Sequence, residues 1–193
     1  KKAVSKCVAT LEKKKYNQQL LDLFSSSSNL LREKIYIDLL LGKLDFSKVS
    51  ESHLHELGIV FPTSSAMCII AHIHPMQHTV SESDVEETLV GFSVSKIVKN
   101  QLSAYFGEVL DFWMDEVNVY LVFSDLPAEE FTAAATNALN IAKKQIKELH
   151  AVRIAYGIGS VADKLSDLCQ SYRKARYNIN LCRSQQKDTG ISE

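Results

Sequence analysis

The chain has 193 residues, of which 46% are hydrophobic and 23% charged, and its formal net charge is -1. This composition is typical of a globular, soluble protein, and the near-neutral charge provides no basic footprint for nucleic acid. No window approaches the roughly 18 consecutive apolar residues of a membrane span, and the charged opening KKAVSKCVATLEKKK lacks the apolar core of a signal peptide. We therefore expect a cytoplasmic protein without a membrane partner.

The four cysteines, Cys7, Cys68, Cys169 and Cys182, show no Cys-x-x-Cys spacing. Reduced thiols of a cytoplasmic protein fit this pattern better than a disulfide framework does. The chain opens on a charged helical pattern without a start methionine, so we expect it to be a piece of a longer protein.

The first 58 residues are predicted to form a helical connector and dimerisation segment. Residues 1–23 have a helical pattern whose apolar stripe is narrow, which suits a two-helix seam better than a globular core. The seam residues are Val4, Val8 and Leu11, and we expect them to pair with a second copy in a homodimer.

Two shorter helices are predicted to follow within the connector. Residues 30–41 (LLREKIYIDLLL) are apolar on most faces and should be buried, with Gly42 as the C-terminal cap. A second short helix begins at Ser50 and is closed by Gly58.

Residues 66–73 (AMCIIAHI) form the first strand candidate, an apolar run between two prolines. A long helix is predicted over residues 81–104, with acidic residues in its first turn. The run 108–124 (EVLDFWMDEVNVYLVFS) then predicts a β-hairpin of strands 109–114 and 117–123. Asp115 and Glu116 lack the glycine that the tightest turns prefer, so we expect a wider or bulged turn.

The remaining elements are a helix from Leu126-Pro127 to about Leu149, a strand over 153–158 and a helix over 163–183. Residues 186–193 are expected to be a linker. The order from residue 66 is β-α-β-β-α-β-α, which predicts an α+β fold, a ferredoxin-like β-α-β-β-α-β sandwich over residues 59–185. Both helical crossovers should lie on one face of an antiparallel sheet.

Three segments carry a resemblance to a known family: LLREKIYIDLLLGKL, LHELGI and YGIGSVADKLSDLCQSYRKARYNI. They resemble the middle region of YesN-type response regulators of the AraC class, and the likeness covers about residues 30–183. The resemblance implies a receiver domain before this region, through which a histidine kinase acts. It also implies a helix-turn-helix domain after residue 193, and DNA would be bound only through that domain.

The middle domain of this family is similar to a degenerate diguanylate cyclase (GGDEF) domain, whose motif lies on the hairpin turn. The corresponding residues here are Trp113, Met114, Asp115 and Glu116, so the acidic pair is kept and both glycines are lost. Those glycines let the backbone approach a phosphate, which bulky side chains prevent. The first strand offers no carboxylate for the metal. The resemblance therefore implies a non-catalytic regulatory domain without a cofactor.

Two groups of side chains suggest other functions. Cys68, His72 and His74 share one face of a strand at even spacing and are candidate metal ligands, although an exposed histidine edge is the simpler interpretation. The aromatic residues of the hairpin, Phe112, Trp113, Tyr120 and Phe123, are either pocket-lining or cross-strand core residues. These groups leave open a ligand- or metal-sensing cyclase-like domain. A further alternative is the equivalent domain of a membrane-sensor AraC-class regulator.

Overall fold

The computed structural model describes residues 29–44, 51–59, 61–75, 84–150, 152–185 and 189–190. Residues 29–40 are helical. The elements that follow are α2 (Glu51–Glu56), β1 (Ser65–Pro75), α3 (Asp84–Phe106), β2 (Val109–Met114), β3 (Val117–Ser124), α4 (Ala128–Leu149), β4 (Val152–Ala162), a 3-10 turn (Leu165–Asp167), α5 (Leu168–Gln185) and β5 (Thr189–Gly190). The described part of the chain contains no helix long and apolar enough to cross a membrane.

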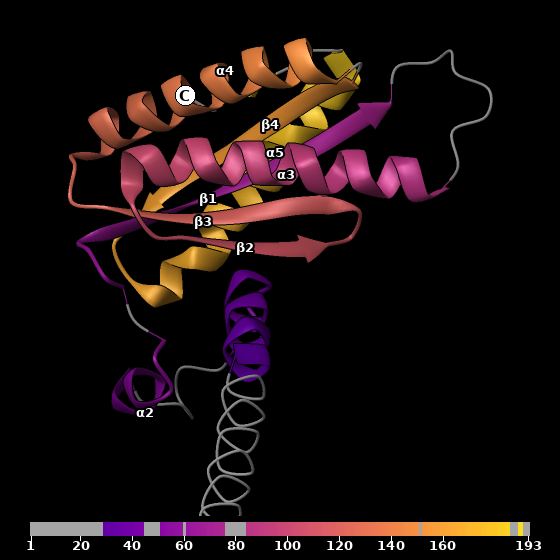
Figure 1. The fold of residues 1–193 in the computed structure, drawn as a ribbon. Helices are drawn as coiled ribbons and strands as arrows, with labels where there is room; N and C mark the ends of the chain where they lie inside the picture. The colour runs from indigo at the N-terminus through magenta and orange to yellow at the C-terminus, as the bar shows by residue number, and fades with distance from the viewer. Residues whose placement is uncertain are drawn as a thin grey trace, which may run out of the picture.

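The strands form one sheet in the order β2-β3-β1-β4-β5 (Figure 1). The first four strands are antiparallel to their neighbours, and the two-residue β5 pairs in parallel with β4. The predicted α+β class, the four main strands and the β2-β3 hairpin are therefore confirmed, with the hairpin at one edge of the sheet. Strand β5 falls where the sequence predicts no strand, because two residues carry no periodic pattern.

Helices cover both faces of this sheet. Helices α3 and α4 lie side by side on one face, as predicted for the two crossovers (Figure 1). Helix α5 and the segment 29–40 pack on the other face. Alternate residues of β1 divide between the two layers: Met67, Ile69 and Ala71 join the α3/α4 cluster, whereas Ala66, Cys68 and Ile70 join the α5 cluster.

Two glycines of β4 allow α5 to lie directly on the strand backbone. A Cβ atom at Gly157 would lie 2.1 Å from the carbonyl oxygen of Ala175, and one at Gly159 would lie 2.2 Å from that of Ser171. Real Cβ atoms do not approach so closely, so neither position tolerates a side chain without movement of the helix. The Gly-Ile-Gly run thus serves helix–sheet packing.

Polar side chains of α5 complete this contact by bonding to the strands beneath. The backbone N–H of Cys68 donates to Ser171 Oγ at 2.9 Å, and Asn178 Nδ2 donates to the carbonyl oxygen of Ile158 at 2.7 Å. Ser171 and Asn178 are both buried. Each buried side chain therefore has a backbone partner in the sheet, which is how buried polar groups avoid a desolvation cost.

Candidate functional site

The turn between β2 and β3 is a two-residue turn. Met114 pairs with Val117, so only Asp115 and Glu116 lie outside the ladder. Their φ angles are 44° and 65°, both in the left-handed region. The prediction of a wider or bulged turn was therefore wrong. Two left-handed residues match the right-handed twist of the flanking strands, and this requirement outweighs the absence of glycine.

This conformation makes the turn a strained point of the fold. Aspartate visits the left-handed region more readily than most residues, whereas glutamate has no such local support. A non-glycine residue in this region costs on the order of 1–2 kcal/mol. The paired strands on either side hold the turn in place despite this cost, because β3 is buried along its whole length.

The side chains at the turn point in different directions. Trp113 is 64% exposed, whereas Met114 is buried. Asp115 Oδ2 lies 3.8 Å from Arg176 Nη2 of α5, and both side chains are partly exposed, so solvent screens this ion pair. Tyr172, one turn earlier on α5, is buried, and its burial raises the pKa of its hydroxyl, which nearby Arg176 partly offsets.

The acidic turn offers little for catalysis or phosphate binding. Two carboxylates repel a phosphate, and the bulky Trp113 and Met114 flank the turn on the β2 side. Among the described residues, no group of three or more histidine, cysteine, aspartate or glutamate side chains is arranged to hold a metal ion. The turn is thus a charged tip with a strained backbone.

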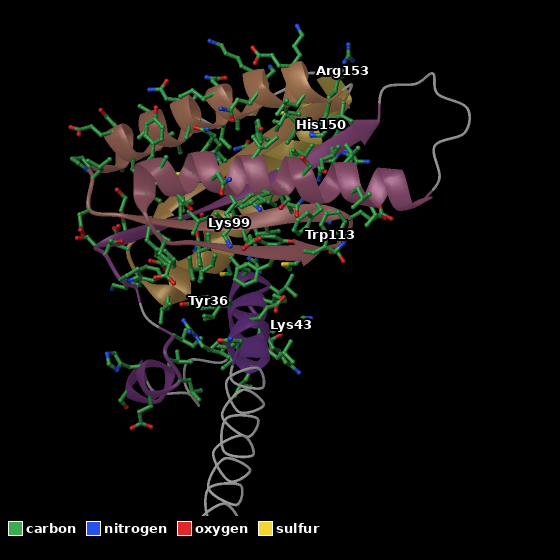
Figure 2. The ribbon with its side chains drawn as sticks, in the orientation of Figure 1. Tyr36, Lys43, Lys99, Trp113, His150 and Arg153 are labelled. Atoms are coloured by element: carbon green, nitrogen blue, oxygen red, sulfur yellow. The ribbon has the colours of Figure 1, made fainter. Side chains whose placement is uncertain are left out.

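The segment 29–40 packs against the inner side of this hairpin. The rings of Tyr36 and Phe112 lie with their centroids 6.0 Å apart and their planes inclined by 36°. Tyr36, Leu39 and Leu40 are buried in the same cluster as Phe112 and Met114. Figure 2 shows Tyr36 below β2 and Trp113 near the hairpin turn. Strand β2 therefore presents Phe112 to the connector and Trp113 to solvent.

The end of this helical segment contacts α5. Gly42, with a φ of 67°, lies so close to α5 that an added Cβ would be 3.5 Å from Cys169 Cβ and 3.6 Å from Arg173 Nη2. The left-handed glycine closes the helix as predicted. The positive guanidinium of Arg173 lies at the helix C-terminus, where the helix dipole favours a cation. The connector thus touches both the hairpin and α5.

The candidate metal ligands of β1 do not form a cluster in the described part of the chain. Cys68 is fully buried against α5, and burial raises the pKa of its thiol, which disfavours the thiolate that a metal requires. His72 is partly buried, and the side chain of His74 lies outside the described residues. A metal site at these residues has no support from the arrangement of the described side chains.

The hairpin aromatic residues do not converge on one pocket. Phe112 and Phe123 belong to the α5 cluster, Tyr120 belongs to the α3/α4 cluster, and Trp113 is exposed. They are core and surface residues on opposite faces of the sheet. The seam residues Val4, Val8 and Leu11 lie outside the described residues.

Sequence reasoning missed the polar contacts of α5 and the approach of Gly42 to that helix. The available signal was the spacing of small and polar residues on α5, with Ser171, Ala175, Asn178 and Cys182 at intervals of three and four. Comparison of the chain with models of known protein families, and with curated protein sequences, finds no match.

Proposed function

We propose that this chain is a non-catalytic, signal-coupling domain of an AraC-class transcriptional regulator of the YesN type. The observation that carries the proposal is the dual contact of the connector. Tyr36 packs on Phe112 of the hairpin, and Gly42 lies against Cys169 of α5. A displacement of the connector would therefore act on both elements at once.

The arrangement of the sheet supports a degenerate cyclase-like ancestry for this domain. The order β2-β3-β1-β4 with antiparallel neighbours is the order that a ferredoxin-like β-α-β-β-α-β sandwich requires. The acidic pair of the family motif occupies the hairpin turn, and its lost glycines leave no close backbone approach to a phosphate. We infer that the domain has kept this architecture and lost the catalysis.

The proposed mechanism is mechanical. A receiver domain before the connector would change the pairing of two connector helices in a homodimer, through Val4, Val8 and Leu11. The movement would reach α5 through the buried face of segment 29–40, because close-packed interfaces transmit displacement rather than absorb it. Helix α5 would then reposition a following helix-turn-helix domain in the cytoplasm. No cofactor takes part.

Hydrogen exchange of backbone amides tests this coupling in the purified chain. We expect Tyr36→Ala to raise the exchange rate of α5 and β2 as well as that of residues 29–40, because the removed ring is shared by one packed cluster. In a regulator that contains this chain, the same substitution should abolish the transcriptional response to receiver phosphorylation while the protein level is maintained.

The control is Leu31→Ala, which truncates a side chain of the same helical segment that is 48% exposed. It should leave α5 and β2 unchanged. If Tyr36→Ala affected exchange within residues 29–40 alone, the connector would not be coupled to α5, and the proposed function would be wrong.

A further inference from the structure

We propose that the outward surface of α4 binds a phosphorylated nucleoside. A shallow cleft of about 670 Å³, open to solvent, lies there, and its volume is within the range of small-molecule sites. It is lined by Tyr105, Asn137, Asn140, Ile141, Lys143, Lys144 and Lys147. This surface does not involve the connector, so the inference stands apart from the proposed signal coupling.

The charge of the cleft favours an anionic ligand. Three of its seven lining residues are lysines and none is acidic, although the whole chain carries a net charge of -1. Within the described part of the chain, Lys144 and Lys147 form no ion pair. Their ammonium groups are therefore available to phosphate oxygens, with which they form charge-assisted hydrogen bonds.

Other lining residues of the cleft suit an aromatic base. The ring of Tyr105, from the last turn of α3, is 46% exposed, and Ile141 is 37% exposed. An exposed ring offers a stacking surface to a base. The amide groups of Asn137 and Asn140 supply both donors and acceptors for the base edge.

Along α4 the amide side chains precede the lysines, which is the order that the base and the phosphates of one ligand require. From Asn137 to Lys147 the helix rises by about 15 Å, at roughly 1.5 Å per residue. The amides of Asn137 and Asn140 lie at one end of this stretch, and the lysines lie toward the other. A base and its phosphates would therefore meet matching groups in one extended pose.

The core does not oppose binding at this surface. The buried side chains of α4, including Ala138, Ala142 and Ile146, face the sheet. The acidic pair Asp115 and Glu116 lies on the hairpin turn, and neither residue lines the cleft. A bound nucleotide would thus neither rearrange the core nor occupy the position that the family motif holds.

Thermal unfolding and isothermal titration of the whole chain test the proposal. The probes are GTP and ATP in EDTA, guanosine, and inorganic tripolyphosphate. We expect a nucleoside triphosphate to raise the melting temperature, because a ligand that binds only the folded state stabilises it. Guanosine and tripolyphosphate alone should each bind more weakly than the nucleotide.

Two variants locate the site. The double substitution Lys144→Gln, Lys147→Gln should weaken nucleotide binding by at least about tenfold, since the loss of a single charge-assisted bond is already worth about that factor. Tyr105→Ala should weaken the binding of the nucleotide and leave that of tripolyphosphate unchanged. The control is the double substitution Lys174→Gln, Arg183→Gln, which removes equal charge from α5 and should leave the affinity unaltered.

Three outcomes would overturn the proposal. The first is that neither triphosphate binds. The second is that tripolyphosphate binds as tightly as the nucleotide, which would reduce the cleft to a general anion surface. The third is that the α5 control weakens binding as much as the α4 variant does, which would indicate non-specific attraction to the whole molecule.

Discussion

The side-chain oxygen of Ser171 accepts a 2.9 Å hydrogen bond from the backbone N–H of Cys68, where β1 changes register against β4. The register shift lies between Met67 and Ile69, so Cys68 has no partner residue in β4. Such an irregularity is costly inside a buried sheet unless another group satisfies the freed donor. Helix α5 supplies that group.

We predict that Ser171→Ala destabilises the fold by about 1–3 kcal/mol, since it leaves a buried N–H unsatisfied. Urea unfolding monitored by circular dichroism measures the change. The control is Ser160→Ala, which removes an exposed hydroxyl from β4 and should alter stability by no more than about 0.5 kcal/mol. Equal effects of the two substitutions would contradict the role assigned to Ser171.

The glycines of β4 give a second prediction. Gly157→Ala or Gly159→Ala should each destabilise the protein by roughly 3 kcal/mol, because the added methyl group would overlap a carbonyl oxygen of α5. The lost stability is again measured by urea unfolding.

Gly91 of α3 serves as the matched control for these glycines. An added Cβ at Gly91 would meet no atom within 4 Å, so Gly91→Ala should stabilise the protein by about 0.5–1 kcal/mol through helix propensity. Opposite signs at Gly91 and Gly157 are the expected result. A gain at both positions would mean that backbone freedom, and not the approach of α5, governs these sites.

The strained turn gives a third prediction. Glu116→Gly should stabilise the fold by about 1 kcal/mol, because glycine adopts a φ of 65° without the steric cost that glutamate bears. The melting temperature should rise accordingly. The control is Lys164→Gly at an exposed residue whose φ is -140°, where glycine brings only its entropy cost and should lower stability.

The elements that could be predicted from the sequence are those with a strong local pattern. The apolar runs of β2 and β3 identify them as strands. The helical spacing of apolar residues in α4 and α5 identifies these segments as helices with a buried face. The turn geometry was not predicted, since strand twist outweighed the preferences of Asp115 and Glu116.

The contacts of the candidate site could not be read from local pattern either. The pairing of Tyr36 with Phe112 joins residues 76 positions apart, and only the packed layers define it. Gly42 was correctly predicted as a helix cap, yet its approach to Cys169 depends on the placement of α5. Contacts between distant segments leave no periodic signal in a single sequence.

Two buried tyrosines of the α3/α4 cluster differ in a way that can be tested. The hydroxyl of Tyr120 donates to the carbonyl oxygen of Ser95 at 3.2 Å and lies 3.1 Å from its Oγ. The hydroxyl of Tyr156 has no hydrogen-bond partner among the described residues. We predict that Tyr120→Phe costs about 1 kcal/mol at pH 7, whereas Tyr156→Phe is neutral or stabilising by about 1 kcal/mol.

The alkaline limb of the stability curve provides the second measurement on the same pair. Burial raises the pKa of Tyr120 and of Tyr156 above the ordinary value. An unfolded tyrosine ionises near pH 10, so above this pH the folded state holds more protons than the unfolded state. Stability must then fall as pH rises, by about 1.4 kcal/mol per pH unit for each such tyrosine.

Either phenylalanine variant should show a shallower fall in stability than the parent chain between pH 10 and 11.5. An unchanged slope in both variants would mean that these hydroxyls ionise freely in the folded protein and are not buried as described.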